Sequence, residues 1–276
     1  MVYQMKLSVY GATGFIGSNF LELYPKHEII KRNDRKPLSN EILYFISTVD
    51  NYNLYKDTSI DVKTNLSILC EVLNFCKKKD IVFNFISSWF VYGKLNSLPA
   101  KETSKCNPTG FYSITKKCAE DLIVSFSETF KTKYRIIRLS NVLGKGDKNI
   151  SNKKNALTWM VNKLKNNETI ELYDNGDPIR DIIHVKDACR AIELICKKGN
   201  TNEIYNVGSG EPITIGKFID IAKAKIKSNS RIIAIDTPEF HSKVQNKHFW
   251  MDNHKLQSLG YKSNFSHEDI INELCQ

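Results

Sequence analysis

The chain has 276 residues, 41% hydrophobic and 25% charged, and its 40 Lys and Arg against 30 Asp and Glu give a formal net charge of +10. These fractions are ordinary for a folded protein and exclude a disordered tail, a collagen and a coiled-coil rod. No apolar run approaches the ~20 residues of a bilayer span, and the N-terminus has no secretory signal pattern, so we expect a cytoplasmic protein without a membrane segment.

Short apolar runs alternate with helical patterns in the first half of the chain. Strands are predicted over residues 6–10, 28–32, 42–46, 81–87 and 134–139, and helices after the glycines at 11–17, over 62–78 and over 111–130. Strands that alternate with helices in this way predict a Rossmann-type, doubly wound parallel α/β sheet.

Beyond Gly144 the chain changes to lysine- and asparagine-rich turns between shorter elements. Helices are predicted over 156–166 and 216–227, a strand end with a helix over 184–197, and a turn over 171–178. We therefore expect a Rossmann domain over residues 1–145 and a smaller, mixed substrate-binding region over 146–276, of which about 180–198 packs back on the first domain.

Three glycines, Gly11, Gly14 and Gly17, follow the first predicted strand and open the first predicted helix. The first glycine permits a tight turn, the second lets a pyrophosphate approach the backbone, and the third lets helix and strand pack closely. The N-terminus of the helix adds unpaired N–H donors and a partial positive charge for phosphate. The pattern predicts a dinucleotide site with these cofactor-binding residues: Gly11, Thr13, Gly14, Phe15, Ile16 and Gly17.

The end of the second predicted strand bears on which dinucleotide binds. An acidic residue there binds the ribose hydroxyls of NAD, whereas an arginine pairs with the 2′-phosphate of NADP. Asn33 stands where the acid is expected, with Arg32 before it and Arg35 after Asp34. We therefore expect Arg32 and Asn33 to contact the cofactor and NADP(H) to be favoured, while Asp34 leaves NAD(H) possible.

The connection from the second to the third predicted strand is unusually short. Residues 33–41 alone separate them, whereas a parallel crossover needs about 12 residues or more and usually includes a helix. A helix and a strand are therefore missing at the edge of the sheet that would hold the adenine, and we expect a sheet shortened there.

Metal and nucleic acid are both disfavoured as ligands. The seven cysteines form no Cys-x-x-Cys pair, and His241, His248 and His254 lack the spacing of helical metal ligands. The lysines occur in short groups along the chain, mostly on predicted helices with acidic neighbours, which is typical of a solvated surface. We expect neither a bound metal nor a nucleic-acid partner.

Tyr112 and Lys116 lie four residues apart on one face of the helix predicted over 111–130, about 6 Å apart along its axis. Ser88 follows the strand predicted over 81–87, and a strand end and the next helix start can converge at the carboxyl edge of such a sheet. Tyrosine has a free pKa of about 10 and needs help to transfer protons near neutral pH. Lys116 supplies positive charge and can hold the nicotinamide ribose, and Ser88 can hydrogen-bond the reacting oxygen. These three are the predicted catalytic residues.

With these motifs in this order, the sequence resembles the extended short-chain dehydrogenase/reductase family, specifically its nucleotide-sugar epimerase, dehydratase and reductase branch. The resemblance covers nearly the whole chain and is carried by Gly11–Gly17, Asn65, Ser88–Gly93, Tyr112–Lys116, Arg138–Gly144, Arg180–Asp187 and Tyr205–Gly210. It implies that Asn141 contacts a bound nucleotide-diphosphate sugar and that Arg180 meets its phosphates, so that the expected substrate-binding residues are Ser88, Trp89, Asn141 and Arg180.

The resemblance also implies an activity and an assembly. It implies hydride transfer between the nicotinamide and a sugar carbon, usually C4 of the hexose, with Tyr112 moving the hydroxyl proton. It implies a homodimer that packs the helices predicted over 62–78 and 111–130 into a four-helix bundle, for which Leu122, Ile123 and Phe126 offer apolar side chains.

The residues after Ser88 bear on which reaction is catalysed. The 4,6-dehydratases of the family carry an Asp-Glu pair there, whereas Trp89 and Phe90 cannot transfer protons, so dehydration is disfavoured. No cysteine follows Ser88 closely, which disfavours the 3,5-epimerising reductases. A 4-ketosugar reductase or an NAD-dependent C4 epimerase remains. The indication of NADP favours the reductase, and a non-catalytic dinucleotide-binding sensor or scaffold stays open as a third interpretation.

Overall fold

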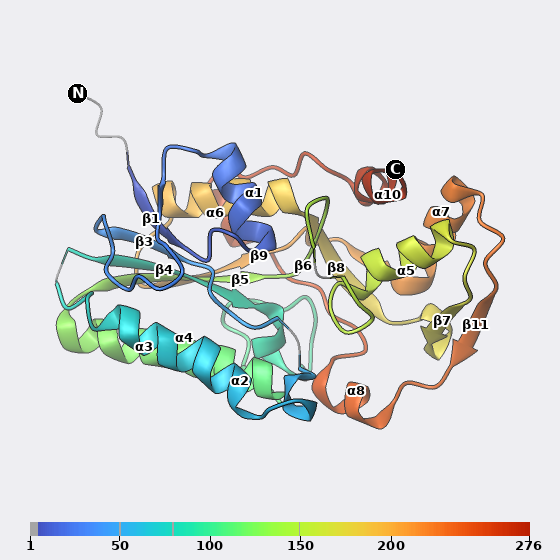
Figure 1. Ribbon diagram of the computed structural model, residues 1–276, viewed down its shortest axis with the longest axis horizontal. Helices are drawn as coiled ribbons and strands as arrows, with labels where there is room; N and C mark the ends of the chain where they lie inside the picture. The colour runs from blue at the N-terminus through green and yellow to red at the C-terminus, as the bar shows by residue number, and fades with distance from the viewer. Residues whose placement is uncertain (1–4, 50, 79, 149) are drawn as a thin grey trace.

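A parallel sheet lies between two layers of helices, and a smaller lobe follows at one end (Figure 1). The computed structural model describes residues 5–49, 51–78, 80–148 and 150–276. The sheet has the order β2-β1-β3-β4-β5-β9, with every neighbouring pair parallel. This confirms the predicted doubly wound α/β fold. Its strands are β1 (Leu7–Tyr10), β2 (Glu28–Ile29), β3 (Glu41–Tyr44), β4 (Val82–Ser88), β5 (Lys133–Leu139) and β9 (Glu203–Val207).

The alternation of side chains along the strands explains the two helical layers. Leu7 and Val9 of β1 belong to one apolar cluster with Ile192 of α6, whereas Tyr10 belongs to a second cluster with Leu69 of α3. The layer on the first face contains α1 (Phe15–Leu23) and α6 (Val185–Lys198), which pack on each other. The layer on the second face contains α2 (Ser59–Val62), α3 (Ile68–Leu73) and α4 (Phe111–Phe130).

Two predicted elements are shorter or less regular than expected. The strand predicted over 28–32 ends at Ile29, because the chain turns back where the amide of Asp34 donates to the carbonyl of Lys31 at 2.9 Å. The helix predicted over 62–78 consists instead of α2, a π-helical turn η2 (Lys63–Ser67) and α3, which ends at Leu73. Residue 79 lies outside the described residues.

The connection between β2 and β3 crosses β1 without a helix or a strand of its own. Ser8 Oγ accepts hydrogen bonds from the amides of Leu38 (2.9 Å) and Ser39 (2.8 Å), and the Tyr10 hydroxyl donates to the carbonyl of Arg35 at 2.7 Å. These contacts hold the loop flat on β1, in the place that a crossover helix would occupy. The two-residue β2 is therefore the edge of the sheet, as the short connection predicted.

The smaller lobe is mixed. It contains a three-stranded sheet of β10 (Pro212–Thr214), β8 (Ile179–His184) and β6 (Asn141–Leu143), and the parallel pair β11 (Ile232–Ile235) and β7 (Ile170–Tyr173). Its apolar core is built mainly by α5 (Ala156–Lys165), α7 (Ile215–Ile226) and α10 (His267–Cys275). The division at residue 145 stays a prediction. Strand β9 and helix α6 follow this position in the chain, but they belong with the larger sheet. The remaining elements are η1 (Asn53–Tyr55), η3 (Trp89–Tyr92), η4 (Asp174–Gly176), α8 (Glu239–Val244) and α9 (His254–Ser258).

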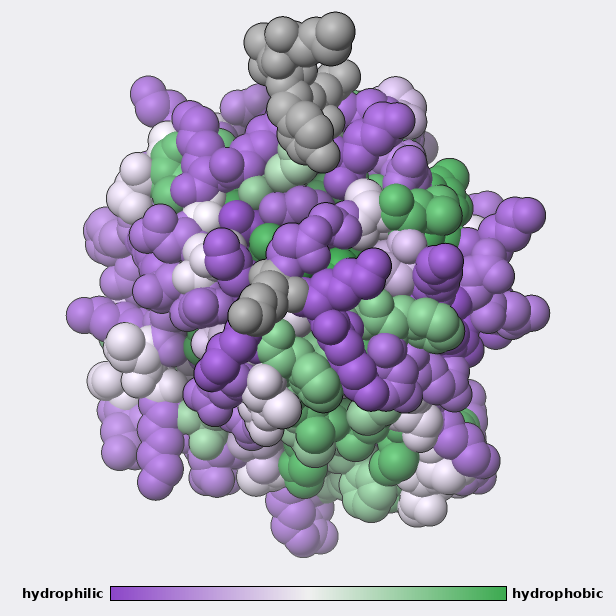
Figure 2. Space-filling model, turned by 90° about the vertical axis from the view of Figure 1, so that its left-hand side faces the viewer, coloured by the Kyte–Doolittle hydropathy of each residue, from purple (hydrophilic) through white to green (hydrophobic). Residues whose placement is uncertain are grey.

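The outer surface of α3 and α4 is partly apolar. Figure 2 shows apolar side chains gathered on the lower half of one face, at the height of α3 and α4 in Figure 1. Phe75, Ile114 and Leu122 are between 37% and 50% exposed. Ile123, which we expected on this surface, is instead fully buried against the sheet, because consecutive helical residues are turned by about 100° and Ile123 therefore faces inward while Leu122 stays exposed. Among the described residues, every helix is too short or too polar to traverse a lipid bilayer.

Candidate active site

The glycine turn between β1 and α1 has the backbone that a phosphate cradle requires. Gly11 has φ +77°, and the amide of Gly14 donates to its carbonyl at 3.1 Å. A Cβ on Gly17 would lie 2.4 Å from that same carbonyl oxygen, so only glycine lets α1 pack this closely on the turn. Thr13 and Gly14 are exposed at the start of α1. The turn therefore fits the pyrophosphate of a dinucleotide, with half-buried Phe15 and Ile16 in the first helical turn.

The turn after β2 presents one unengaged guanidinium. Arg32 and Asn33 are exposed at its tip. Arg35 is held by the protein, since its Nε donates to Glu71 Oε2 at 2.5 Å and its Nη1 donates to the carbonyl of Arg32 at 3.0 Å. Of the two arginines near this edge, Arg32 is therefore the one that is exposed to solvent.

Ser88 is the last residue of β4, a strand that is buried along its whole length. It opposes Leu139 in β5, so it lies at the carboxyl edge of the sheet. Its Oγ accepts a hydrogen bond of 3.4 Å from the amide of Phe90 and so caps η3.

Tyr112 and Lys116 flank Ser88 from α4. The Lys116 Nζ donates to the carbonyl of Ile86, two residues before Ser88, at 2.5 Å. The Tyr112 ring lies edge-on to the ring of Phe90, two residues after Ser88, with their centres 5.8 Å apart. The structure thus brings the three predicted catalytic residues to one place at the edge of the sheet.

The environment of Lys116 brings its titration close to neutral pH. The side chain is 2% exposed, and its Nζ lies 4.2 Å from the centre of the Phe85 ring. Burial lowers the pKa of Lys116 to about 7, against the opposing field of the Glu120 carboxylate. Glu120 offsets only part of this effect, and its carboxylate is itself paired with Arg138 at 2.7 Å.

Asn65 fixes the start of the catalytic helix. Its Nδ2 donates to Thr48 Oγ1 at 2.8 Å and to Thr115 Oγ1 at 2.9 Å, while its Oδ1 accepts from the amide of Thr48 at 2.8 Å. The Thr115 hydroxyl in turn donates to the carbonyl of Tyr112 at 2.9 Å. Asn65 lies in the π-helical turn η2, a type of distortion that is common at functional sites.

Arg180 approaches the same place from β8 of the smaller lobe. It is 6% exposed, and its Nη1 donates to the carbonyls of Ile179 (2.7 Å) and Lys247 (2.8 Å), while its Nη2 donates to Gln245 Oε1 at 3.3 Å. These partners are all neutral. Burial lowers the pKa of Arg180 to about 10, so the guanidinium remains a charge that lacks a compensating anion.

An aromatic stack joins Arg180 to the catalytic residues. The ring of Trp89 lies 4.1 Å from that of Phe90 and 4.6 Å from that of Phe249, and the Arg180 guanidinium lies 5.6 Å from it. Asn141, the other residue expected at the substrate, is tied to the neighbouring strand, because its Nδ2 donates to the carbonyl of Asp181 at 3.0 Å.

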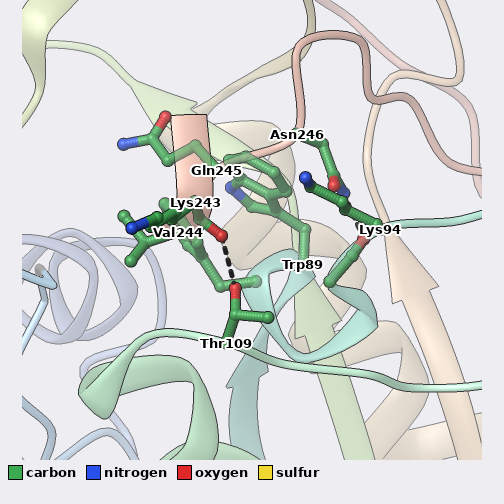
Figure 3. A pocket seen from close by; sticks show the side chains of 9 residues that line it. Trp89, Lys94, Thr109, Lys243, Val244, Gln245 and Asn246 are labelled. Carbon is green, nitrogen blue, oxygen red and sulfur yellow. Dashed lines mark hydrogen bonds between the residues drawn. The ribbon is translucent and has the colours of Figure 1, made fainter. Parts of the chain in front are cut away.

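A segment that the sequence did not indicate covers the stack. We call residues 239–247, which comprise α8 and the three residues after it, the strap. Figure 3 shows its residues facing Trp89, Lys94 and Thr109 across a narrow pocket, with the Thr109 hydroxyl donating to the carbonyl of Lys243 at 2.7 Å. No local motif could have indicated the strap, since its contacts with Thr109 and Arg180 join residues more than sixty positions apart in the chain.

This fold and this site define the class of the protein as an extended short-chain dehydrogenase/reductase. A parallel sheet carries a glycine cradle at one strand end, and a serine, tyrosine and lysine meet at another. The model of the family described as "NAD dependent epimerase/dehydratase family" matches residues 40–208, more than half of the chain. The chain belongs to that family, as its sequence motifs predicted.

Curated relatives of similar length carry several activities. The chain is 25% identical to low-salt glycan biosynthesis protein Agl12 of Haloferax volcanii, over 98% of this chain and 97% of the relative. It is 24% identical to a putative UDP-glucose 4-epimerase of Methanocaldococcus jannaschii, over 92% of each chain. It is 27% identical to dTDP-4-dehydro-6-deoxyglucose reductase of Escherichia coli, over 75% of this chain and 64% of the relative.

Solved structures share the fold over nearly the whole chain. The UDP-glucose 4-epimerase of Thermotoga maritima with UDP-glucose has a TM-score of 0.87 at 19% identity, covering 98% of this chain and 97% of that one. RMD of Pseudomonas aeruginosa complexed with NADPH has a TM-score of 0.83 at 19% identity, covering 98% of each chain. Both matches concern the fold alone.

Proposed function

We propose that this protein reduces the 4-keto group of a nucleotide-diphosphate sugar, with a 4-keto-6-deoxyhexose as the expected substrate class and NADPH as the reductant. One observation carries the proposal: Ser88, Tyr112 and Lys116 meet at the sheet edge, while Trp89 and Phe90 follow Ser88 as a packed aromatic pair. A site with one proton-transferring phenol and no second acid/base pair suits ketone reduction and does not suit dehydration.

In this proposal each of the three catalytic residues has a different role. The bound nicotinamide supplies the hydride. Tyr112 donates its phenolic proton to the sugar O4 as the ketone becomes a hydroxyl, and solvent restores that proton. Lys116 stabilises the phenolate by its charge and is placed to hold the nicotinamide ribose. Ser88 hydrogen-bonds O4 and orients the carbonyl.

Arg180 would bind the substrate's diphosphate. A buried guanidinium with only neutral partners gains an opposite charge when a diphosphate reaches it, and bidentate pairing favours arginine for this role. The aromatic stack of Trp89 and Phe90 spans from Arg180 to Tyr112, so a hexose bound at both ends would lie along it. Asn141 would meet the nucleotide sugar through its Oδ1 while its Nδ2 stays bonded to the backbone of β8.

The choice of NADPH rests on the turn after β2. Arg32 is exposed there, an asparagine stands where NAD-binding proteins carry an acid, and the loop over β1 leaves no helix or strand beside the adenine. A cofactor held in such an open place can exchange at each turnover, as a reductase requires. One relative is a dTDP-4-dehydro-6-deoxyglucose reductase, which supports this choice.

The second candidate is an NAD-dependent C4 epimerase, which one relative of matching length favours. An epimerase needs the same three catalytic residues but retains its NAD and reoxidises it internally. The deciding experiment denatures purified protein, scans the released material at 340 nm, and separately follows NADPH consumption with 4-keto-6-deoxy nucleotide sugars. Net NADPH oxidation supports the reductase, whereas tightly retained NAD with no net oxidation overturns it.

We also propose that the chain forms a homodimer through α3 and α4. The half-exposed apolar side chains of Ile114 and Leu122 on α4 and of Phe75, two residues after α3, support the proposal, because apolar surface of this kind is stabilised when a second copy covers it.

A further inference from the structure

The neutral partners of Arg180 come largely from the strap. Gln245 Oε1 and the carbonyl of Lys247 accept two of its hydrogen bonds, and the bond to Gln245, at 3.3 Å, is longer than most hydrogen bonds of this type. These groups satisfy the donors of the guanidinium without neutralising its charge. An anion that replaced Gln245 would keep the hydrogen bond and add the missing opposite charge.

The strap also closes on the first half of the chain. The Tyr52 hydroxyl and His241 Nδ1 lie 2.9 Å apart, and the ring of Phe240 packs edge-on against Tyr52 and Tyr55 at 5.3 and 5.1 Å. His241 is therefore held between the loop after β3 and the smaller lobe, where its ring lies 4.9 Å from that of Tyr173.

Half-buried His241 is joined to buried Arg180 through Gln245, whose backbone amide donates to the carbonyl of His241 at 3.0 Å and whose Oε1 accepts from Arg180 at 3.3 Å. Burial and the charge of Arg180 together lower the pKa of His241 to about 4. Its hydrogen-bond partner is a phenol and not a carboxylate. The imidazole is thus neutral at physiological pH because of its burial and the positive charge of Arg180, and an arriving anion would offset that charge.

We propose that His241 is a second binding residue for the substrate's diphosphate, and that it takes up a proton when the diphosphate reaches Arg180. The proposal rests on the proposed function, because it requires a nucleotide sugar at this site. The diphosphate displaces Gln245 from Arg180 and reverses the local field, so the charged imidazole becomes favourable. The proton comes from solvent, and the Tyr52 hydroxyl, which can donate or accept, then accepts from Nδ1–H.

The carboxylates near His241 are already paired with lysines, so protonation of the imidazole depends on a bound ligand. The carboxylate of Glu239 is paired with Lys243 at 2.6 Å, and those of Asp174 and Asp177 share Lys247 at 3.4 and 2.8 Å. The titratable and charged groups around His241 are Tyr52 with the Lys153 ammonium 5.2 Å above its ring, Tyr173 and Asp174, Arg180, and Glu239, Lys243 and Lys247 of the strap.

The test measures proton uptake on binding by isothermal titration calorimetry. UDP-glucose and dTDP-glucose are titrated into the full-length protein at several values between pH 5.5 and pH 8, in buffers of different ionisation enthalpy. Their diphosphates are diesters that do not titrate in this range, so any proton taken up belongs to the protein. Uridine and thymidine, which lack the diphosphate, serve as matched ligands.

We expect proton uptake with the nucleotide sugars and none with the nucleosides, and an affinity that rises as the pH falls. In His241→Gln the uptake should vanish and binding at pH 6 should weaken roughly tenfold, which corresponds to one pKa unit. His254→Gln changes an exposed histidine on α9 and should keep the wild-type uptake.

Three results would overturn the proposal. Binding of nucleotide sugars without proton uptake in the wild-type protein contradicts it even if the variants fail to fold. Equal uptake in wild type and in a folded His241→Gln, checked by circular dichroism, contradicts the role of this residue. Failure of both nucleotide sugars to bind at millimolar concentration removes the proposed function as well, and is distinguished from the other two results by the absence of any binding heat.

Discussion

The Lys116 ammonium donates a hydrogen bond of 2.5 Å to the carbonyl oxygen of Ile86, two residues before Ser88. This bond joins the catalytic helix to the strand that ends in the catalytic serine, and it places a cation where almost no water reaches it. The same contact therefore both positions the Lys116 ammonium and removes it from water, and both effects have measurable consequences.

The first consequence is a pH-dependent stability. The pKa of Lys116 is about 7 in the folded protein, below the 10.5 of an exposed lysine, so the unfolded chain binds more protons between these values. We expect the free energy of unfolding to rise with pH from about 7 to 10, by up to about 1.4 kcal/mol per pH unit from this group. Lys116→Met should remove that slope in urea unfolding, and a slope unchanged in the variant would contradict the assignment.

The second prediction concerns chemistry. Tyr112→Phe removes the proton that the proposed reduction delivers to the sugar oxygen, so kcat should fall by about a hundredfold or more while NADPH binding stays unchanged. Stopped-flow absorbance and a binding titration measure the two quantities. Tyr134→Phe is the matched control, since Tyr134 lies near the start of β5, at the opposite end of the strand from the site. Unchanged turnover in Tyr112→Phe would contradict the role of this phenol as proton donor, whereas a cellular role left intact in the variant would support the scaffold interpretation.

The third prediction separates the two dinucleotides. Arg32→Ala should weaken NADPH binding by roughly tenfold or more and leave NADH binding nearly unchanged, because only the former carries the 2′-phosphate. Fluorescence titration of each cofactor is the measurement. Lys6→Ala removes one positive charge at the opposite end of β1 and serves as the control for net charge. Equal effects on NADPH and NADH would place the 2′-phosphate elsewhere.

The fourth prediction concerns a buried carboxylate far from the site. Burial disfavours the ionised form of Glu193, but hydrogen bonds from His27 and Lys197 outweigh it and lower its pKa to about 2. Its stabilising effect is therefore present above the unfolded pKa of about 4.5 and is lost as the pH falls toward 2. Glu193→Gln should reduce the free energy of unfolding at pH 7 by about 1–3 kcal/mol. Glu268→Gln, on the surface, should change little.

The fifth prediction concerns assembly. Light scattering at micromolar concentration should give the mass of a dimer for the wild-type chain and of a monomer for Leu122→Glu, because a charge in an apolar interface is desolvated without a partner. Leu38→Glu, on the loop over β1 and 67% exposed, should remain dimeric. A monomeric wild-type protein would refute the proposed interface.

Much of the larger sheet could be predicted from the sequence because its signals are local. Strand β4 begins with a mostly apolar run, and the three glycines after β1 have the spacing of a tight turn followed by a closely packed helix. The shortened edge was also predictable, since the number of residues between β2 and β3 is a property of the sequence.

What could not be predicted depends on contacts between distant residues. The π-helical turn at 63–67 accompanies hydrogen bonds that join Asn65 to Thr48 and Thr115, which periodicity within one helix does not reveal. The burial of Ile123 likewise depends on how α4 is rotated on the sheet. The strap was missed because its partners, Tyr52 and Arg180 among them, lie far from it in sequence.

The pairing of β9 with β5 has a consequence for synthesis of the protein. A nascent chain that has reached residue 145 has made five of the six strands, yet one side of β5 still lacks its neighbour, and α6 is not yet available to cover Leu7 and Val9. The ribosome must synthesise about sixty further residues before β9 can pair with β5. A stalled or proteolysed N-terminal fragment would therefore expose an unpaired strand edge and be prone to aggregate.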